Sequence, residues 1–498
     1  MHKNARTERP PVVVVLGHVD HGKSSLLDFI RKSAIVASEA GGITQHTAAY
    51  EVTHTTGTGA EKRITFIDTP GHEAFAAQRR RGASLADVAV LVVSAEDGVK
   101  AQTKEALAAI KESDIPYIVA VNKIDLPAAD IEKTLTTLAE NEVYVEGRGG
   151  DVPYALISAK RGDGVPELLE LITLSAELQE LTGDPEAPAE GIIVEAHRDP
   201  QTGISATFII KNGTLTTGMS LASEGAYAPV RGMHDSRGTK VEKASFSSPV
   251  TVVGWSALPE AGAAVTAHKK KKEAEEAAAT TRRQRTVAAA SGNDDDESAI
   301  IPLIIKADVV GSLGAVKHEV GKLTDDRVRF KTIHADVGAI SEADIKRAGG
   351  DARTVIVGFN VGLENGVREL AQRAGVRIET NSIIYKLSEW LAGVLQERRP
   401  KRLTEEKYGT AKVLKIFSKT HTKQIVGARV EEGAFKVGGT LQILRRGEEI
   451  GKGKILELQQ GKQNTGQVAE GTEFGGKIDS NVEIAPGDIL IEFAHVEK

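Results

Sequence analysis

Residues 12–30, VVVVLGHVDHGKSSLLDFI, decide the fold of the N-terminal part of this chain. A run of consecutive valines without polar alternation is typical of a strand buried on both faces of a parallel sheet. The adjoining GHVDHGKS, residues 17–24, fills the pattern G-x-x-x-x-G-K-[ST] between a strand and a helix, the setting in which this motif binds phosphate. The stretch therefore predicts a P-loop, whose backbone N–H groups and helix N-terminus point at phosphate oxygens.

Further continuous apolar runs follow, and each precedes a stretch with helical character. The runs are ITFID, VAVLVVSA, YIVAVNKID and YALISA, at residues 64–68, 88–95, 117–125 and 154–159. Strands of this kind that alternate with helices indicate a parallel sheet covered on both faces. We therefore predict an α/β P-loop domain over residues 10–182, preceded by an N-terminal tail of residues 1–9.

The P-loop assigns nucleotide contacts to a continuous set of residues. Lys23 is expected to reach the β- and γ-phosphates, and the Ser24 hydroxyl to ligate Mg²⁺. The side chains of His18 and His21 are interpreted mainly as packing groups, because the backbone of such a loop does the binding. The loop residues expected to bind nucleotide are Gly17, His18, Val19, Asp20, His21, Gly22, Lys23, Ser24 and Ser25.

Two further loops complete the expected phosphate site. Asp68 ends the run ITFID, where it is placed to hold Mg²⁺ through water, and Gly71 lets the backbone approach the γ-phosphate. His72 follows directly and is the candidate catalytic residue that orients the attacking water. Thr44, in EAGGITQHT at residues 39–47, is the candidate second hydroxyl ligand of Mg²⁺ when the γ-phosphate is present.

The sequence NKID, at residues 122–125, indicates which nucleotide base the site binds. The Asp125 carboxylate can accept from both the ring N–H and the exocyclic amine of guanine, whereas adenine offers no such donor pair. A backbone N–H after a later strand would complete the pocket. The expected base-contacting residues are Asn122, Lys123, Asp125, Ser158, Ala159 and Lys160. In this order behind a P-loop, they predict GTP and GDP as ligands.

The remainder of the chain changes character several times. Short strands between glycine turns indicate a β-barrel over residues 183–268. The charge-rich residues 269–299 are interpreted as a linker, whose Lys/Glu/Ala half could form a solvated helix. We predict an α/β domain of alternating strands and helices over residues 300–382, a connecting helix over residues 383–407, and a second β-barrel over residues 408–498. The predicted fold class is α/β: a P-loop GTPase domain, a β-barrel, a small α/β/α domain, a long connecting helix and a second β-barrel.

Composition narrows the possible functions. The chain has 498 residues and no cysteine, which excludes disulfides, thiolate zinc sites and cysteine nucleophiles. Its net charge of -6 gives no overall electrostatic case for nucleic acid, although single domains can still carry basic patches. No apolar run in the sequence approaches membrane-spanning length, and the first residues lack a signal-peptide core. We therefore expect a cytoplasmic protein that does not bind membranes, and a monomer.

These motifs closely resemble bacterial-type translation initiation factor 2, a family of GTPases of the elongation factor class. The resemblance is carried by GHVDHGKSSLLDFIR, EAGGITQHTAAYEV, ITFIDTPGHEAF, RGASLADVAVLVVSAEDGV and VNKID, and it extends over almost the whole chain. It implies placement of formylmethionyl initiator tRNA on the 30S ribosomal subunit, joining of the 50S subunit and GTP hydrolysis stimulated by the ribosome. Ribosomal RNA would push His72 into place, and Asp20 would help to hold a monovalent cation.

The C-terminal barrel departs from the family pattern. The family has a cysteine in a G-x-E-C-G stretch that is implicated in recognising the formylmethionyl end, and this chain has GTEFG, residues 471–475. A second cysteine position is Ala428, and the family's basic-aromatic run becomes QQGK, residues 459–462. Phe474 is expected to pack on an aminoacyl or base face. The resemblance gives as candidate tRNA contacts Arg429, Lys462, Glu473, Phe474 and Gly475.

The altered barrel leaves two alternatives to an initiation factor open. One is a translational GTPase that binds ribosomes but has no selectivity for initiator tRNA. The other is a GTP-gated scaffold outside translation whose barrels bind protein.

Overall fold

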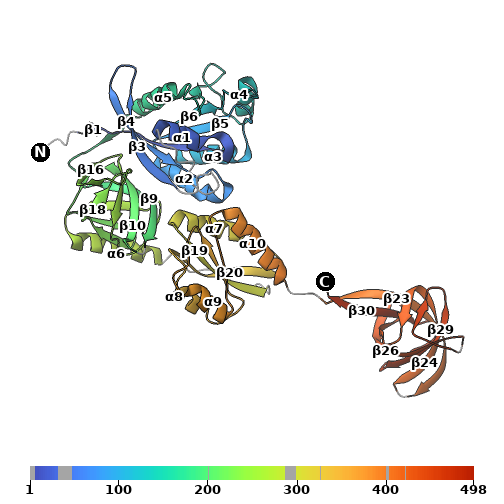
Figure 1. Ribbon diagram of the computed structural model, residues 1–498. Coiled ribbons are helices and arrows are strands. Elements are labelled where there is room, and N and C mark those ends of the chain that lie inside the picture. Colours follow the sequence, from blue (N-terminus) through green and yellow to red (C-terminus); the bar gives the residue numbers. More distant parts are fainter. Residues whose placement is uncertain are drawn as a thin grey trace. The chain divides into compact units, whose positions relative to one another are not determined.

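The computed structural model divides the chain into two compact units, Met1–Arg398 and Arg399–Lys498 (Figure 1). The residues that it describes are 6–31, 47–199, 201–286, 299–325, 327–399, 403–420, 422–461 and 463–497. Two predicted site residues, Thr44 and Lys462, lie outside these ranges. The two units are described separately below.

The first domain of the first unit is built on a six-stranded sheet with the order β3-β4-β2-β5-β6-β7. Its strands are β2 (Val12–Gly17), β3 (Ala48–Thr55), β4 (Glu61–Asp68), β5 (Val88–Ser94), β6 (Tyr117–Asn122) and β7 (Tyr154–Leu156). All pairs are parallel except the edge pair of β3 with β4, which is antiparallel. The carboxyl ends of the parallel strands therefore meet at one edge, where the P-loop and the nucleotide motifs follow.

The valine run of β2 lies at the centre of this sheet and is buried on both faces. The helices that cover the two faces of this sheet are α1 (Lys23–Arg31), α2 (Ala76–Leu85), α3 (Ala101–Ser113), α4 (Ile131–Ala139) and α5 (Val165–Leu178). Val12 and Val14 join a core cluster with residues of α2, α3 and α4. Val13 and Val15 join a second cluster with residues of α1 and α5. The absence of alternation in the sequence thus reflects a strand with apolar neighbours on both sides.

The second domain is a curled antiparallel sheet around its own core, which contains Phe208 and Trp255. Its strands are ordered β13-β12-β18-β9-β10-β17-β14-β15, with β11 and β16 as a separate pair. They are β9 (Glu190–Asp199), β10 (Gly203–Asn212), β11 (Thr214–Thr216), β12 (Ser220–Ser223), β13 (Ala226–Pro229), β14 (Met233–His234), β15 (Lys240–Val241), β16 (Lys243–Ser245), β17 (Pro249–Val253) and β18 (Ala264–His268). The short strands between glycine turns give the predicted β-barrel.

The charged stretch expected to be a linker differs from that expectation in its first half. Helix α6 (Lys271–Thr286) follows the second domain directly, and it contacts β12, β13 and β18. Ala274 and Ala278 are buried against Ala222 of β12. The small alanines let the helix approach the sheet closely while its lysines and glutamates face water, so a low apolar content is sufficient for docking.

The third domain is a four-stranded parallel sheet with the order β20-β19-β21-β22. Its elements are β19 (Ala299–Ala307), α7 (Val310–Lys322), β20 (Val328–Val337), α8 (Glu342–Arg347), β21 (Val355–Phe359), α9 (Val367–Ala374), β22 (Arg377–Asn381) and α10 (Ile384–Glu397). A capping box begins α8: the Ser341 N–H and hydroxyl both donate to the Asp344 carboxylate.

Helix α10 was expected to be a connecting helix, and it instead forms a layer of the third domain. It ends at Glu397, and Leu387, Leu391 and Val394 are buried with the strands β19 and β21 and helix α7. Their spacing of four and three residues places them on one helical face. The next strand, β23 (Leu403–Thr420), begins within the range 383–407 that had been expected to be helical.

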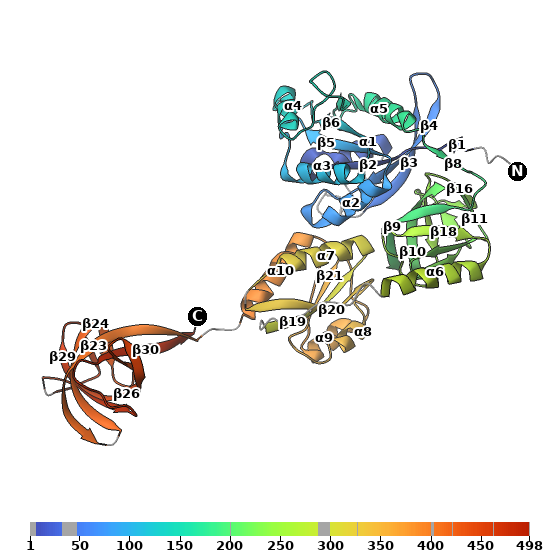
Figure 2. The same ribbon diagram turned by 180° about the vertical axis from the view of Figure 1, so that it is seen from behind.

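The second unit is a β-barrel that closes on itself (Figures 1 and 2). Its strands are β23, β24 (Lys423–Lys436), β25 (Thr440–Arg445), β26 (Glu448–Gln460), β27 (Gln463–Thr465), β28 (Gln467–Ala469), β29 (Glu473–Ser480) and β30 (Ile489–Glu497). The pairing order β23-β30-β25-β26-β29-β24 becomes a ring because β24 also pairs with β23. A single apolar cluster fills the interior.

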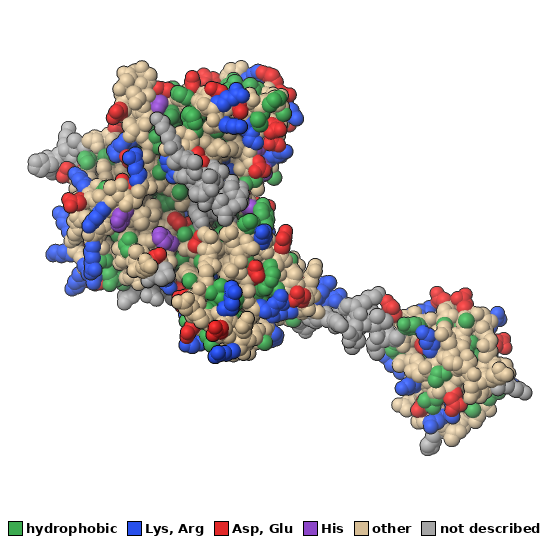
Figure 3. Space-filling model, in the orientation of Figure 1, with side chains coloured by type: hydrophobic (Ala, Val, Ile, Leu, Met, Phe, Trp, Pro, Cys, Tyr) green, Lys and Arg blue, Asp and Glu red, His purple; other side chains and the backbone are tan. Residues whose placement is uncertain are grey.

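Charge is mixed rather than concentrated on the one face of the molecule that Figure 3 shows. On the face shown in Figure 3, basic and acidic side chains are interspersed over both units. None of the helices within the described ranges is both long and apolar enough to cross a membrane.

A buried carboxylate, Asp87, joins three segments of the first unit. The Arg9 guanidinium contacts it through two hydrogen bonds of 2.7 Å, and the Lys211 ammonium of the second domain donates to it over 2.9 Å. The backbone N–H of Val12 also donates to it, over 2.8 Å. Burial alone would raise the pKa of Asp87, but the hydrogen bond from Arg9 and the charge of Lys211 outweigh burial and lower it.

We predict that Asp87→Asn lowers the unfolding temperature in calorimetry. The substitution leaves two partly buried cations without their counter-charge, a change that typically costs about 3–5 kcal/mol. Glu112→Gln is the control, because Glu112 is exposed and lies 4.0 Å from the exposed Arg80 in a surface ion pair. Since the pKa of Asp87 is depressed, its contribution is complete above about pH 4 and is lost as the pH falls further. Equal unfolding temperatures for Asp87→Asn and wild type would contradict this role.

Candidate nucleotide-binding site

Two glycines of the P-loop occupy positions that exclude any side chain. Gly17 ends β2 with φ 146°, and a Cβ there would lie 2.4 Å from the Val92 carbonyl oxygen of β5. Gly22 has φ 85°, and its Cβ would lie 2.4 Å from the Asn122 amide nitrogen. The loop therefore turns back against β5 and against the start of the NKID motif, as a phosphate-wrapping loop must.

Lys23 begins helix α1 and is almost completely buried, with 3 % of the residue exposed. Its ammonium donates to the His18 carbonyl oxygen over 2.7 Å. A Cβ on Gly71 would lie 2.4 Å from this ammonium and 2.8 Å from the Val19 Cα, so the DTPG turn abuts the P-loop at this point. Burial lowers the pKa of Lys23 to about 8, against the opposing charge of Asp68.

The donor chemistry at this edge fits Mg²⁺. Ser24 follows Lys23 at the start of α1, and the largely buried Asp68 ends β4. A hydroxyl and a carboxylate are hard oxygen donors, and Mg²⁺ usually takes one or two such ligands and completes its shell with water and phosphate. Within the described residues, no three or more histidine, aspartate or glutamate side chains are grouped so that they could hold a metal ion by themselves.

The two P-loop histidines differ in their surroundings. The His21 ring is fully buried, and its Nδ1 lies 3.3 Å from the Val92 carbonyl oxygen. Burial lowers the pKa of His21 to about 3, so the ring is neutral at physiological pH. The His18 ring meets it edge-on with the centroids 5.0 Å apart. These positions agree with the interpretation of both side chains as packing groups.

Asn122 links the three loops that would surround a guanine nucleotide. Its amide nitrogen donates to the His21 carbonyl over 2.8 Å, and its amide oxygen accepts from the Ala159 N–H over 2.9 Å. The Ser158 hydroxyl donates to the Asp125 carboxylate over 2.8 Å, and this hydrogen bond lowers the pKa of Asp125. Asp125 is thus held in its ionised form, which is the acceptor that guanine requires. The bracing by Asn122 is a function that sequence reasoning missed.

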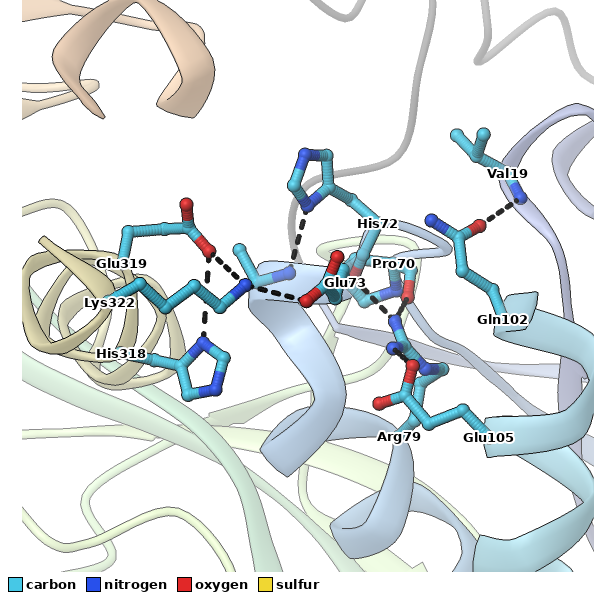
Figure 4. Close-up of polar contacts among 11 residues, drawn as sticks. Val19, Pro70, His72, Glu73, Arg79, Gln102, Glu105, His318, Glu319 and Lys322 are labelled. Atoms are coloured by element: carbon cyan, nitrogen blue, oxygen red, sulfur yellow. Dashed lines mark hydrogen bonds and ion pairs between the residues drawn. The ribbon is translucent and has the colours of Figure 1, made fainter. Parts of the chain in front are cut away.

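His72 lies in a buried turn, with 4 % of the residue exposed. Its Nδ1 accepts a hydrogen bond from the Ala74 N–H over 2.9 Å, so a neutral ring carries its proton on Nε2 (Figure 4). Nε2 has no hydrogen-bond partner among the residues that the structure describes. Burial lowers the pKa of His72, and the nearby Glu319 carboxylate opposes this effect.

Aromatic and apolar contacts with the third domain hold the turn around His72. The Tyr385 ring of α10 covers the imidazole with the centroids 3.9 Å apart. Ala74 and Phe75, in the short helix η3 (Glu73–Phe75), are buried within the core of the third domain. Glu73 accepts from Lys322 of α7 over 2.7 Å (Figure 4). Only tertiary structure brings these partners together, and no signal in the sequence identifies Tyr385 or Lys322.

The predicted tRNA contacts separate into outward and inward residues. Arg429 of β24 pairs with Glu473 of β29, and Gly475 pairs with Gly427 of β24, on the outer face of the barrel. Phe474 points inward, with 4 % exposed, and its ring lies 5.6 Å from that of Phe435. The expectation that Phe474 packs on an aminoacyl or base face is therefore corrected. Side chains alternate along a strand, so the residue between two outward positions faces the core.

An exposed aromatic ring does lie on this outer face. A Cβ on Gly427 would lie 2.8 Å from the ring of Phe417, which is 63 % exposed. The Lys415 ammonium lies 5.9 Å from the same ring. Sequence reasoning missed Phe417, because its position beside Gly427 depends on the register of β23 against β24.

We predict that nucleotide binding takes up a proton above about pH 8. Phosphate oxygens favour the ammonium form, so binding raises the pKa of Lys23 from about 8. The affinity for GTP is therefore complete below that pH and falls above it, by up to about tenfold per pH unit. Calorimetry at about pH 9, in buffers of different ionisation enthalpy, measures the uptake, and the control at about pH 7 shows less. Equal uptake at both pH values would exclude Lys23 as the source.

We predict that Tyr385→Ala raises the pKa of His72 toward its ordinary value. Removing the covering ring lets water reach the imidazole, which reverses part of the burial that lowers the pKa. Tyr385→Phe keeps the ring and should leave the pKa of His72 unchanged. NMR titration of the imidazole C–H signals, assigned with His72→Ala, measures both. A wild-type pKa in Tyr385→Ala would show that the ring does not shield His72.

Comparison with known proteins identifies the family of each part. The Elongation factor Tu GTP binding domain matches residues 8–177, and Elongation factor G domain 2 matches residues 188–268. Translation-initiation factor 2 matches residues 273–392. The matches confirm the predicted fold class of a P-loop GTPase domain followed by a barrel, and they support guanine nucleotide binding.

Relatives named Translation initiation factor IF-2 match nearly the entire chain. The relative from Rubrobacter xylanophilus is 38 % identical over 98 % of this chain and 72 % of its own length. Those from Campylobacter lari and Parvibaculum lavamentivorans are 37 % and 38 % identical over 99 % and 98 % of this chain. The chain spans little more than half of their lengths, 57 % and 56 %.

A solved structure, GDP-bound aIF5B from Aeropyrum pernix, is 26 % identical over 98 % of this chain and 92 % of its own, with a TM-score of 0.46. The family rests on the sequence relatives and on the matched domains. The chain belongs to the translation initiation factor IF-2 family and carries its GTPase domain.

Proposed function

We propose that this protein places formylmethionyl initiator tRNA on the 30S subunit in a GTP-dependent manner, promotes joining of the 50S subunit, and hydrolyses GTP when the ribosome stimulates it. The observation that carries the proposal is the convergence of P-loop, DTPGH turn and NKID motif at one edge of the sheet, with the turn docked in the third domain. The family supports it, because its members are initiation factors by name.

In this proposal the chain's own groups hold the nucleotide. The P-loop backbone and Lys23 bind phosphate, the Gly71 N–H contacts the γ-phosphate, and Asp125 accepts from the guanine edge. Ser24 and Asp68 would hold Mg²⁺, with Thr44 joining them in the GTP state. When bound, Mg²⁺ supplies positive charge that neutralises the phosphate oxygens during transfer. Asp20 is proposed to help hold a monovalent cation.

Hydrolysis requires His72 to leave its resting position. A neutral imidazole can accept a proton or a hydrogen bond only at the nitrogen without hydrogen, which is Nδ1 here and is occupied by the Ala74 N–H. Exchange of the tautomer also breaks this bond, because a protonated Nδ1 cannot accept from the Ala74 N–H. The ring must therefore give up this hydrogen bond and turn from beneath Tyr385 before it can accept a hydrogen bond from the attacking water. We propose that ribosomal RNA induces this change, which would make hydrolysis slow on the free protein and fast on the ribosome.

The proposed partners are the 30S and 50S subunits, ribosomal RNA and formylmethionyl initiator tRNA, with the protein a cytoplasmic monomer. On the barrel, Arg429, Glu473 and Gly475 are the proposed tRNA contacts. Phe417 is proposed to offer an exposed aromatic ring on the same face. A glycine beside a ring leaves room for a flat or short group to stack, and aromatic side chains commonly receive unpaired RNA bases in this way.

One observation favours a second candidate, a ribosome-binding GTPase without selectivity for initiator tRNA. Phe474 and Ala428 are both buried in the barrel core at the positions where the family has cysteines. Gln459 pairs with Gly475 where the family has a basic-aromatic run, so the surface offers fewer cations to the acceptor stem.

The experiment measures GTP hydrolysis with and without 30S and 50S subunits, adding formylated or unformylated initiator tRNA and following 70S formation. Strong stimulation by ribosomes, with joining accelerated by formylated tRNA, is the expected result. Stimulation indifferent to formylation would favour the second candidate. No response to ribosomes would refute both proposals.

We predict that His72→Ala retains GTP and GDP affinity and loses ribosome-stimulated hydrolysis. Water positioning by an acid–base side chain contributes on the order of 10²–10⁴-fold in rate, so the stimulated rate should fall by that factor. Nucleotide affinity serves as the control for an intact site, and rapid-quench measurement of phosphate release reports the rate. A stimulated rate equal to that of wild type would remove His72 from the mechanism.

A further inference from the structure

We propose that Arg79 is the positioning residue for the backbone of the Pro70–His72 turn, aiming the Gly71 N–H at the γ-phosphate and fixing the backbone position about which the His72 ring turns when it acts. The expected effect of Arg79 on hydrolysis at the ribosome rests on the proposed function. The expected effect of Arg79 on nucleotide affinity requires only the GTPase domain. Arg79 is the fourth residue of α2, which begins at Ala76, and the short helix η3 lies between α2 and the turn that Arg79 holds.

The guanidinium contacts the turn on both sides of Gly71. Its Nη1 donates to the Pro70 carbonyl over 3.0 Å and to the His72 carbonyl over 2.5 Å (Figure 4). The Pro70 carbonyl and the Gly71 N–H belong to one planar trans peptide unit, in which they point in opposite directions. Fixing the carbonyl therefore fixes the direction of the N–H, which is the group expected to contact the γ-phosphate.

The burial of Arg79 is difficult to explain by packing alone. The residue is 1 % exposed, and its side chain is one of the largest fully buried in the described part of the chain. Its Nε has no hydrogen-bond partner among the described residues. Burying a cation costs several kcal/mol, and an apolar side chain of similar size often serves stability as well or better. The Arg79 guanidinium donates hydrogen bonds to two backbone carbonyls, which an apolar side chain in the same place could not do.

A second set of contacts anchors Arg79 to a support shared with the P-loop. Its Nη2 donates to the Glu105 carboxylate of α3 over 2.6 Å. One turn earlier on α3, the Gln102 side-chain oxygen accepts from the Val19 N–H of the P-loop over 3.0 Å (Figure 4). Residues three apart lie on the same side of a helix. Helix α3 thus fixes the distance between the P-loop and the turn. Gln102 binds the P-loop directly, and Glu105 holds Arg79, which in turn binds the carbonyls of the turn.

Lysine is the informative replacement, because it keeps the positive charge and loses the planar fork that reaches two carbonyls and a carboxylate together. The neighbouring Arg80 provides the matched control: its side chain is 65 % exposed and lies 4.0 Å from Glu112 on the same pair of helices. Arg80→Lys makes the same chemical change on α2 without touching the turn.

The experiment compares Arg79→Lys, Arg80→Lys and wild type for GTP and GDP affinity with fluorescent nucleotide analogues, and for hydrolysis on ribosomes. For Arg79→Lys we expect GDP affinity within about twofold of wild type, weaker GTP affinity, and a kcat on ribosomes lower by about 10–100-fold with KM for ribosomes unchanged. For Arg80→Lys we expect wild-type values. GDP affinity checks that the P-loop and base pocket are intact.

Equal losses of GTP and GDP affinity in Arg79→Lys would overturn the proposal, because they would indicate a general structural role. Unchanged GTP affinity together with an unchanged kcat would also overturn it. If Arg79→Lys does not fold, Glu105→Gln, whose side chain is 29 % exposed, tests the same anchor and should shift GTP affinity and kcat in the same direction by a smaller factor. Unchanged GTP affinity and kcat in that variant would also overturn the proposal. A wild-type protein that ignores ribosomes would refute the proposed function, while the GTP-to-GDP affinity ratio would still decide the role of Arg79.

Discussion

The burial of strand β2 on both faces is the constraint on which the remaining structure depends. Its valines belong alternately to two separate cores, one formed with α2, α3 and α4 and the other with α1 and α5. Neither set of helices can shift without disturbing the strand that they share, because protein interiors are close-packed. The P-loop leaves the end of this strand, and its glycines fit against β5 and Asn122 with no space for a side chain. The rigidity of the two cores is thus passed directly to the loop that wraps phosphate.

The turn that carries His72 has a different support. It follows β4 at the same edge of the sheet, but Ala74 and Phe75 are buried in the core of the third domain. A movement of this turn therefore changes apolar packing in another domain, and a movement of that domain acts on the turn. Arg79 and helix α3 resist such movement from the side of the GTPase domain. The position of His72 reflects a balance between two attachments, an arrangement that suits the response to the ribosome proposed for this residue.

The nucleotide site was predictable from sequence because its residues come in short motifs whose spacing is set by local backbone geometry. Asp68 and Asn122 each end a strand, Lys23 follows the loop that leaves the end of β2, and a parallel sheet brings strand ends together. Arg79, Tyr385 and Lys322 were not predictable, since each contacts the site through tertiary packing. Helix α10 was misjudged for a related reason: its apolar stripe was visible in the sequence, but not the core that it covers. Phe474 was placed on the wrong face because a motif position does not show which face of a strand is turned inward.

The closed ring of the second unit has a consequence for how it meets other molecules. Because β24 pairs with β23 as well as with β29, the six principal strands have neighbours on both sides. Backbone groups that are already paired offer no template on which a foreign peptide can add a strand, and this also removes a common route to aggregation. Any selectivity of this unit for a binding partner must then come from its surface side chains and from the spaces between them. Evolution can consequently change what the unit recognises by exchanging single surface residues, while the scaffold beneath them remains as it is.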